Sequence, residues 1–305
     1  MQSEGSEDIS VLIVGGGLIS REYGMICSHL SVETTLISRG FNKDRLLDNV
    51  NYVAGDFYDF STEYLRKFSH VIIAVQPRFT FEILYWILQN TSAKILVEKP
   101  VCLSSQEFNR VDCDEFDQRV YVAFNRRFFA SSMAAKGILA DKPILALEVC
   151  FTEMKSRMRG SEDELRLWGM CNTIHLFDMA FNLAGMPTNV EVARSKLGGV
   201  DSYSVVGSLP NGLLAMNAHW GGPGNWGITV TTPAEKLFFD PLEKLRVQKS
   251  GSFTKDEMPL DSDVNRGFKD GFFAQTADFL DGRKDMFISH ANYKRLILLI
   301  EKIFN

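Results

Sequence analysis

The chain has 305 residues, 45% of them hydrophobic, and a formal net charge of -5 at pH 7. This length allows two domains of ordinary size, each with a buried core. The net negative charge argues against nucleic acid as a partner, because nucleic-acid binding needs a basic surface.

The cysteines and the N-terminus predict where the protein resides. The five cysteines are widely spaced and include no C-x-x-C pair, which argues against a disulfide framework or a metal site. The first ten residues are acidic and polar, unlike a secretory or mitochondrial signal, and no apolar run reaches the roughly 18 residues of a membrane span. We therefore expect a cytoplasmic protein with a short frayed N-terminal segment and no membrane partner.

Up to residue 124, short apolar runs alternate with amphipathic stretches, which is the pattern of a parallel sheet covered by helices. The predicted strands are Val11–Val14, Thr34–Ile37, Tyr52–Val53, Val71–Val75, Ile95–Val97 and Val120–Phe124. The predicted helices are Arg21–Leu30, Phe79–Leu88 and Ser105–Val111. This alternation predicts a doubly wound α/β domain of the Rossmann type over residues 1–124.

After about residue 143 the strand signals become longer, and they predict a second domain over residues 125–305. The predicted strands are Ile144–Phe151, Val190–Ala193, Tyr203–Ser208 and Leu213–Trp220, and the predicted helices are Phe272–Leu280 and Asn292–Ile303. Pro210-Asn211-Gly212 is a hairpin signal between the last two strands. We therefore expect antiparallel pairing in this domain.

A glycine-rich turn, Gly15-Gly16-Gly17-Leu18-Ile19-Ser20, directly follows the first predicted strand and leads into a helix. This context favours a dinucleotide site, in which Gly15 permits the tight turn and Gly17 lets the backbone approach a pyrophosphate. The backbone at Leu18 and Ile19 would then present N–H groups to the phosphates. Ser20 replaces the third glycine of the motif. The alternative is a glycine turn in a Rossmann-like domain that binds no nucleotide.

The second strand ends at Ser38-Arg39, where a carboxylate would normally hold the 2′-hydroxyl of the adenosine ribose. A serine hydroxyl and a guanidinium suit a 2′-phosphate instead. The residues therefore favour NADP(H) over NAD(H). A solvated arginine in a surface loop is the alternative.

Glu98-Lys99-Pro100 follows the fifth strand, at the edge where doubly wound sheets bind ligands. A partly desolvated lysine near a cationic nicotinamide has a lowered pKa and can exchange a proton with substrate. A surface Glu–Lys pair is the alternative interpretation.

With this motif the chain resembles the Gfo/Idh/MocA oxidoreductase family, whose members carry Glu-Lys-Pro after the fifth Rossmann strand. The resemblance continues through three further segments and covers nearly the whole chain: Val122-Ala123-Phe124-Asn125-Arg126-Arg127-Phe128, Ala218-His219-Trp220 and Glu235–Pro241. It implies a Rossmann domain joined to an α/β domain with a large, mostly antiparallel sheet. It also implies NAD(P) as cofactor, sugars or related polyols as substrates, and a homodimer or homotetramer formed through the second-domain sheet.

A predicted amphipathic helix over Gly169–Leu183 places Cys171, His175, Asp178 and Asn182 on one face. Such a face either lines a hydroxyl-rich substrate site or faces solvent. The family pattern Asp-x-x-x-His-x-x-Asp assigns His175 as catalytic and Asp178 as its neighbouring acid.

The chain departs from the family at three positions. Cys171 stands where the family usually has Asp, Thr173 where it usually has Gly, and Phe81 where a His usually follows the fourth strand. A neutral thiol orients an imidazole poorly compared with a carboxylate. Substrate or mechanism has therefore diverged from the common pattern, or turnover has been lost.

The resemblance and the residues together assign the site as follows. The catalytic residues are Lys99 and His175, either of which would exchange the hydroxyl proton during hydride transfer. The cofactor-binding residues are Gly15, Gly17, Leu18, Ile19, Ser38, Arg39, Gln76, Pro77, Glu98, Lys99 and Arg127. The substrate-binding residues are Asn125, Cys171, Asp178 and Asn182, with Arg127 at the nicotinamide or the substrate.

Three functions remain compatible with these residues. The first is an NADP(H)-dependent oxidoreductase of a sugar, sugar nucleotide or polyol. The second is a reductase of a non-sugar C=N or C=C bond, favoured by the missing Asp and by the aromatic Phe79 and Phe81. The third is a regulatory protein that senses the dinucleotide without turnover, favoured by Cys171.

Overall fold

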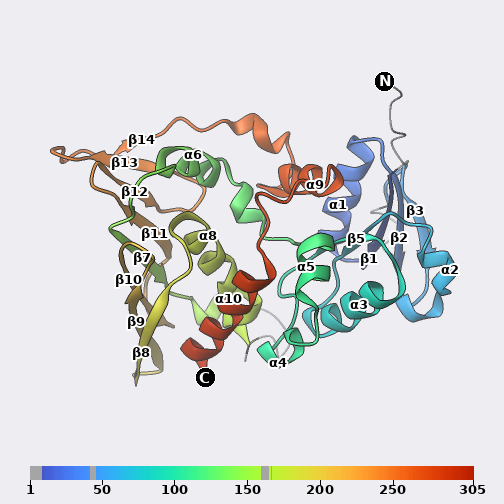
Figure 1. Ribbon diagram of the computed structural model, residues 1–305, viewed down its shortest axis with the longest axis horizontal. Helices are drawn as coiled ribbons and strands as arrows, with labels where there is room; N and C mark the ends of the chain where they lie inside the picture. The colour runs from blue at the N-terminus through green and yellow to red at the C-terminus, as the bar shows by residue number, and fades with distance from the viewer. Residues whose placement is uncertain (1–8, 42–45, 159–164, 166) are drawn as a thin grey trace. The chain divides into compact units, whose positions relative to one another are not determined.

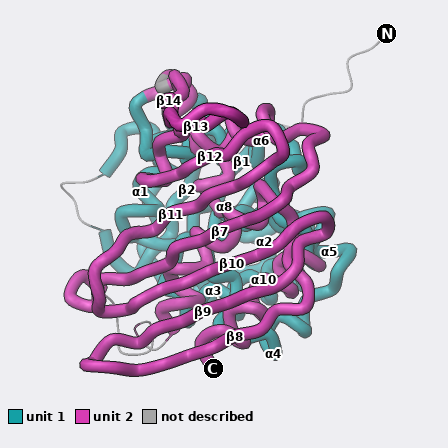
Figure 2. The backbone as a smooth tube through the Cα atoms, turned by 90° about the vertical axis from the view of Figure 1, so that its left-hand side faces the viewer, with its two compact units in different colours: residues 1–123, 267–290 teal, residues 124–266, 291–305 magenta. Residues whose placement is uncertain are grey.

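The computed structural model describes residues 9–41, 46–158, 165 and 167–305. The chain forms two compact units, coloured separately in Figure 2: unit 1 is Met1–Ala123 with Gly267–His290, and unit 2 is Phe124–Arg266 with Ala291–Asn305. The predicted division at residue 124 lies next to the first of these limits, whereas the return of the chain to unit 1 had no counterpart in the prediction. Of the ten-residue segment predicted to be frayed, residues 1–8 lie outside the described residues, and Ser10 is the first residue of strand β1.

Unit 1 is built on a six-stranded parallel sheet in the order β3-β2-β1-β4-β5-β6. The strands are β1 (Ser10–Val14), β2 (Glu33–Ser38), β3 (Asn51–Ala54), β4 (His70–Ile73), β5 (Lys94–Val97) and β6 (Val120–Val122). This is the strand order of a Rossmann fold, whose ligands bind at the carboxyl ends of the strands where the order reverses, between β1 and β4. The predicted fold class of this half is confirmed.

Within the described residues, the α-helices of unit 1 are α1 (Leu18–His29), α2 (Thr62–Leu65), α3 (Pro77–Asn90), α4 (Ser105–Phe108), α5 (Cys113–Arg119) and α9 (Phe272–Leu280). The returning helix α9 lies beside α1 (Figure 1). The rings of Tyr23 in α1 and Phe272 in α9 lie 5.2 Å apart between centroids. The C-terminal part of the chain therefore completes the core of the N-terminal unit.

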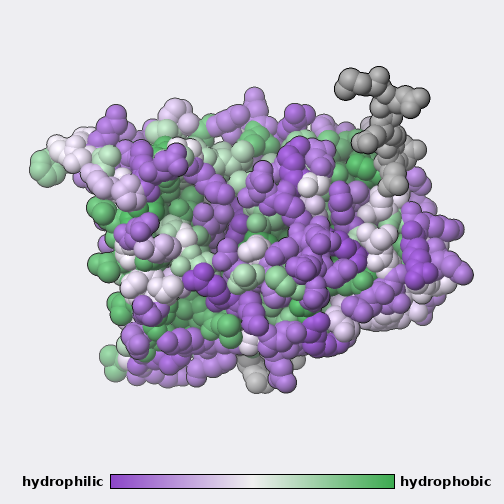
Figure 3. Space-filling view, viewed as in Figure 1, coloured by the Kyte–Doolittle hydropathy of each residue, from purple (hydrophilic) through white to green (hydrophobic). Residues whose placement is uncertain are grey.

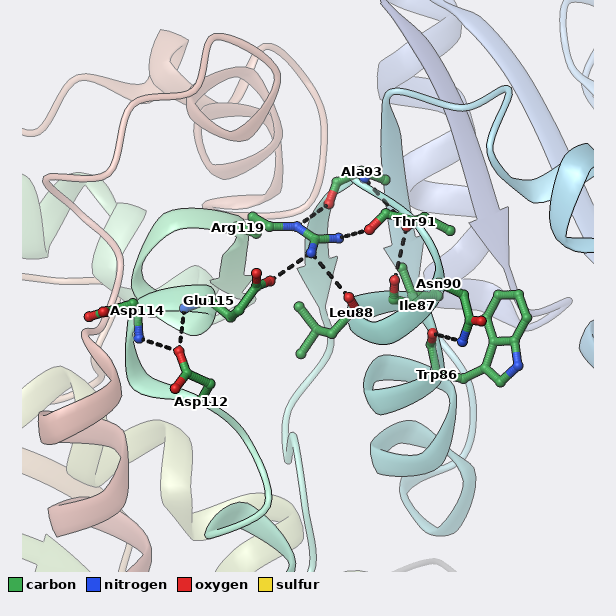
Figure 4. Close-up of polar contacts among 10 residues, drawn as sticks. All are labelled: Trp86, Ile87, Leu88, Asn90, Thr91, Ala93, Asp112, Asp114, Glu115 and Arg119. Carbon is green, nitrogen blue, oxygen red and sulfur yellow. Dashed lines mark hydrogen bonds and ion pairs between the residues drawn. The ribbon is translucent and has the colours of Figure 1, made fainter.

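Arg119, the last residue of α5, satisfies carbonyl groups left open where α3 ends (Figure 4). Its guanidinium donates to the carbonyl oxygens of Leu88 at 3.2 Å, Thr91 at 2.7 Å and Ala93 at 3.2 Å. A cation at this place also opposes the negative end of the α3 dipole. The contact fixes the loop that leads from α3 into β5, and so the strand that carries Glu98 and Lys99.

Unit 2 contains an eight-stranded sheet in the order β14-β13-β12-β11-β7-β10-β9-β8. Its strands are β7 (Ala146–Phe151), β8 (Thr188–Leu197), β9 (Val200–Ser208), β10 (Leu213–Trp220), β11 (Trp226–Thr231), β12 (Glu235–Phe239), β13 (Arg246–Lys249) and β14 (Asp256–Glu257). Every neighbouring pair is antiparallel except β7 with β10. The prediction of a mostly antiparallel sheet is confirmed, including the β9–β10 hairpin.

The sheet of unit 2 has one covered and one open face. Helices α6 (Ala130–Leu139), α8 (Ile174–Ala184) and α10 (His290–Phe304, which lies in unit 2 after its first residue) are on one side of it (Figure 1). Along β10, buried residues from Leu214 to Trp220 alternate with exposed ones, as expected for a sheet with one covered face. Figure 2 looks onto the opposite face, where the strands themselves lie nearest the viewer.

Within the described ranges, no helix is both long and apolar enough to cross a membrane.

We predict that His70 makes unit 1 sensitive to acid. His70 begins β4, is 5% exposed, and has its pKa lowered to about 4 mainly by burial and further by the charge of Lys94. The unfolded chain binds this proton near pH 6.5, so stability is lost as the pH falls from about 6.5 towards 4. Chemical unfolding measures the free energy of unfolding at pH 7 and at pH 4.5. The decrease in this free energy from pH 7 to pH 4.5 should be about 2 kcal/mol smaller in His70→Leu than in the wild type.

The control for this experiment is His219→Leu, which removes an exposed histidine of β10. This variant should keep the pH dependence of the wild type. Equal pH dependence in His70→Leu and the wild type would contradict the prediction.

Candidate functional site

The turn between β1 and α1 is packed on one side and open on the other. Gly15 has φ +131°, and a Cβ there would overlap the carbonyl oxygen of Ala74. The hydroxyl of Ser20, which is fully buried, donates to the same oxygen at 3.1 Å. A Cβ at Gly17 would meet no atom of the described residues within 4 Å. The backbone at Gly17 is therefore accessible to a ligand, while Gly15 and Ser20 hold the turn against β4.

Helix α1 begins at Leu18, directly after Gly17, and no side chain caps its first turn. Its first N–H groups are left without an intrahelical partner, and the helix dipole adds a positive potential there. The predicted residues Leu18 and Ile19 lie in this turn, and Leu18 is 64% exposed. The arrangement suits an anionic group such as a pyrophosphate.

The end of β2 presents two cations around an aromatic ring. The guanidinium of Arg39 lies 5.7 Å from the ring centroid of Phe79, and that of Arg78 lies 4.6 Å from it on the α3 side. Ser38 donates from its hydroxyl to the carbonyl of Gly40 at 3.0 Å. Asp56 lies 4.0 Å from Arg39, and both side chains are largely exposed. Sequence reasoning missed Arg78, although its position at the start of α3 was a usable signal.

At the end of β5, Glu98 enters a hydrogen-bond chain inside unit 1. The hydroxyl of Tyr23 donates to Oε1 of Glu98 at 2.7 Å, and Gln275 of α9 donates to that hydroxyl at 3.1 Å. Burial raises the pKa of Glu98 above its usual range, against the opposing charge of Lys99. The neighbouring Lys99 is half-buried and precedes a cis peptide bond to Pro100.

At the end of β4, Gln76 is the N-cap residue of α3 and Pro77 is its first residue. Both therefore lie at the carboxyl edge of the sheet, where a Rossmann fold binds its ligand. Phe81 is 3% exposed and stacks on Tyr85, with the guanidinium of Arg110 4.9 Å from its ring centroid. Phe81 is thus a packing residue of α3.

The residues of unit 1 fit a nicotinamide dinucleotide. The open backbone at Gly17, the uncapped start of α1 and the groups at the ends of β2, β4 and β5 belong to the edge at which a Rossmann sheet binds its ligand. Gly15, Gly17, Leu18 and Ile19 would hold the pyrophosphate, and Ser38 and Arg39 the adenosine ribose.

In unit 2, α8 is preceded by a π-helical turn over Gly169–Thr173. A Cβ at Gly169 would overlap the ring of Phe304, so the wide turn and this glycine allow α8 to pack beside α10. Cys171, in the place of the usual Asp, is half-buried. His175 is 8% exposed, and its ring centroid lies 6.1 Å from that of Phe124. The polar face of this helix is therefore buried rather than turned to solvent.

Arg127 and Asp178 form a buried ion pair. Nε of Arg127 donates to Oδ2 of Asp178 at 2.8 Å, and Nη2 donates to Oδ1 at 2.7 Å. The Asp178 side chain is fully buried and that of Arg127 is 9% exposed. The structure thus joins two predicted site residues to each other, and direct contact of Asp178 with substrate would require the pair to separate.

The two predicted asparagines differ in their surroundings. Asn125 lies in the short helix η3 (Asn125–Phe128) and is 7% exposed. Asn182 lies near the end of α8, and among the described residues its buried Nδ2 has no hydrogen-bond partner. Of the two, Asn182 therefore has a donor left over for a ligand.

A carboxylate that sequence reasoning missed lies just beyond β7. Oε1 of Glu153 accepts hydrogen bonds from Asn172 at 3.1 Å, Thr173 at 3.2 Å and the indole of Trp226 at 3.2 Å. Burial raises the pKa of Glu153. Two of its donors come from the turn that carries Cys171. The usable signal was the alternation of β7, which places Leu147, Val149, Phe151 and then Glu153 on the helix-covered face.

Arg126, beside Arg127 in η3, is a second group that sequence reasoning did not single out. Its guanidinium lies 5.1 Å from the ring centroid of Trp226 and 5.9 Å from that of Phe129. Burial lowers its pKa to about 10, while Glu243 and Glu153 act in the opposite direction. Among the described residues, its buried Nε has no hydrogen-bond partner.

Across the part of the chain that the structure describes, no group of three or more His, Cys, Asp or Glu side chains is arranged to hold a metal ion.

Comparison with known proteins gives the fold. No family model matches the sequence, and no curated protein matches it. A solved dehydrogenase from Chromobacterium violaceum superposes with a TM-score of 0.76 at 15% identity, covering 97% of this chain and 94% of that one. UDP-N-acetylglucosamine 3-dehydrogenase from Acidithiobacillus ferrooxidans gives 0.73 at 15%, with 97% and 96% covered. Levoglucosan dehydrogenase in complex with NADH gives the same four values. The chain thus shares the two-part architecture of these proteins along nearly its full length.

We predict that the Arg127–Asp178 pair is a large contributor to the stability of unit 2. Asp178→Asn removes the buried negative charge that accepts the hydrogen bonds from Nε and Nη2 of Arg127, which should lower the free energy of unfolding by about 3 kcal/mol. The matched control is Asp201→Asn, because Asp201 pairs with Lys155 and Lys196 where solvent reaches all three side chains. The control should cost less than about 1 kcal/mol. Equal losses in urea denaturation of the two variants would contradict the prediction.

Proposed function

We propose that the chain is an NAD(P)-dependent oxidoreductase of the Gfo/Idh/MocA type that transfers hydride to or from a sugar, sugar nucleotide or polyol. The observation that carries this proposal is the open Gly17 backbone at the switch point of a 3-2-1-4-5-6 sheet. The shared fold supports the substrate class, because two similar structures are a sugar-nucleotide dehydrogenase and levoglucosan dehydrogenase with NADH.

Within this function, NADP(H) is favoured over NAD(H). Arg39 and Arg78 bring two guanidinium groups to the same ring at the end of β2, where Ser38 adds a hydroxyl. A 2′-phosphate would accept hydrogen bonds from these groups and would replace Asp56 as the partner of Arg39.

Lys99 and His175 are the candidates for proton exchange. When bound, a nicotinamide dinucleotide supplies or accepts the hydride. The chain then has to move one proton to or from the substrate hydroxyl, and a lysine ammonium or an imidazole does so near neutral pH. Glu98 is held by Tyr23 and orients the Glu-Lys-Pro segment from inside unit 1.

A regulatory protein that senses the dinucleotide is the second candidate function. Cys171 favours it, because a thiol at that position cannot replace the charge of a carboxylate. The alternative of a non-sugar C=N or C=C reductase loses one of its arguments, since Phe81 packs beneath Arg110.

We also propose that the protein works in the cytoplasm as a homodimer or homotetramer formed through the open face of the unit 2 sheet. Leu197, Val206 and Leu213 are 83%, 54% and 68% exposed on strands of that sheet. Apolar surface is visible along the strands of unit 2 in Figure 3. Burial of such side chains against a second copy would stabilise the assembly.

For the cofactor, Arg39→Ala and Arg78→Ala should each raise the dissociation constant for NADPH about tenfold and leave that for NADH unchanged, because only NADPH carries the 2′-phosphate. Arg110→Ala is the control, since Arg110 pairs with Glu82 on the surface of unit 1. Fluorescence titration measures all four proteins. Equal weakening of both cofactors, or tighter binding of NADH by the wild type, would remove the NADP(H) preference.

For the reaction, Lys99→Ala should lower kcat by a factor of about 100 or more while changing NADPH affinity less than about threefold, because it removes a proton donor rather than a phosphate contact. The assay follows NADPH oxidation against a panel of keto-sugars and imines. Lys67→Ala, on the surface of unit 1, is the control. Full turnover in Lys99→Ala would assign the proton step to His175, and cofactor binding without turnover on any panel member would favour the regulatory function.

A further inference from the structure

Arg126 is a partly buried cation of unit 2 that forms no ion pair among the described residues. In the described residues its Nε has no hydrogen-bond partner, and its guanidinium stacks over Trp226 and Phe129 instead. The neighbouring Arg127 has a bidentate carboxylate at 2.7 Å and 2.8 Å. Desolvating a guanidinium is unfavourable unless a partner returns the lost hydrogen bonds. Within the part of the chain that the structure describes, Arg127 is therefore paired with a carboxylate and its neighbour Arg126 is not.

The surroundings of Arg126 hold it in place without neutralising it. Trp226, whose ring lies under the guanidinium, donates its indole N–H to Oε1 of Glu153. That oxygen also receives hydrogen bonds from Asn172 and Thr173, so the charge of Glu153 is stabilised by neutral donors of its own. Glu243 is exposed to solvent, which screens its effect on Arg126.

We propose that Arg126 binds an oxyanion, a carboxylate or a phosphate, carried by the substrate, and that Glu153 positions Trp226 beneath the guanidinium. This inference rests on the proposed function and narrows its substrate class from sugars, sugar nucleotides and polyols in general to acidic sugars, sugar phosphates or sugar nucleotides. A planar guanidinium backed by an indole presents its remaining N–H groups edge-on, the geometry that bidentate binding of an oxyanion requires. The substrate-binding residues predicted from sequence did not include Arg126 or Glu153.

Calorimetric titration of the NADPH-saturated protein with glucuronate, glucose 6-phosphate, UDP-glucose and glucose tests the proposal. At least one anionic probe should bind about tenfold or more tightly than glucose. The preferred probe identifies the source of the oxyanion, a carboxylate, a phosphate monoester or a diphosphate. Arg126→Gln should weaken binding of that probe by about tenfold or more and leave binding of NADPH and glucose unchanged.

Three further variants test the specificity of the effect and the role of Glu153. Arg246→Gln removes an arginine of β13 in the same unit and should change nothing. Glu153→Ala removes the acceptor of the Trp226 indole N–H and should weaken binding of the anionic probe. Glu153→Gln retains an oxygen acceptor and should restore most of the protein's affinity for that probe. Glu153→Gln keeps the hydrogen-bond acceptor but loses the negative charge. Restored affinity in this variant would therefore show that Glu153 positions Trp226 and does not act through its charge.

Two results would overturn the proposal: no anionic probe binds more tightly than glucose, or Arg126→Gln retains the wild-type preference. Normal NADPH binding and circular dichroism in Arg126→Gln establish that the variant is folded. The same titrations without NADPH separate the two proposals: binding of the anionic probe through Arg126 by a protein that a separate titration shows to bind no NADPH would refute the proposed function and leave this inference intact. A protein that binds NADPH but prefers glucose to every anionic probe would refute this inference and leave the proposed function intact.

Discussion

The close approach of Gly15 to the carbonyl of Ala74 is the constraint on which the architecture of unit 1 depends. It brings the end of β1 against the end of β4, the two strands between which the sheet order reverses. Any side chain at Gly15 would separate them. Ser20 works with this constraint, because its hydroxyl bonds to the same carbonyl where the usual motif has a third glycine. The turn is thus fixed from inside while its outer backbone, at Gly17, stays clear.

Much of this half could be predicted because buried parallel strands are short apolar runs, and their positions follow from composition alone. The predicted strands Val11–Val14 and Ile95–Val97 lie within one residue of β1 and β5. The return of α9 to unit 1 could not be predicted in this way, since its amphipathic pattern shows that it has a buried face but not which core receives it. The π-helical turn before α8 could not be predicted for a similar reason, because it depends on the contact of Gly169 with Phe304, which is remote in sequence.

The polar groups of unit 2 show what sequence patterns miss in a site. The helical spacing of His175 and Asp178 was visible, but the burial of Asp178 against Arg127 was not, because the partner comes from a different element. Glu153 and Trp226 lie at the ends of neighbouring strands and meet only through the register of β7 with β11. Cys171 consequently lies within a turn that is hydrogen-bonded to a carboxylate, and the helical spacing alone could not predict these surroundings.

The central claim is that the open backbone at Gly17 is a dinucleotide site. Gly17→Val tests it most directly, because a Cβ there meets no described atom within 4 Å and would project into the space that a pyrophosphate needs. We expect NADPH fluorescence to report binding to the wild type. We also expect the variant to keep the wild-type melting temperature and to lose at least about tenfold in NADPH affinity. Absence of binding by the wild type, or unchanged affinity in a folded Gly17→Val, would contradict the central claim.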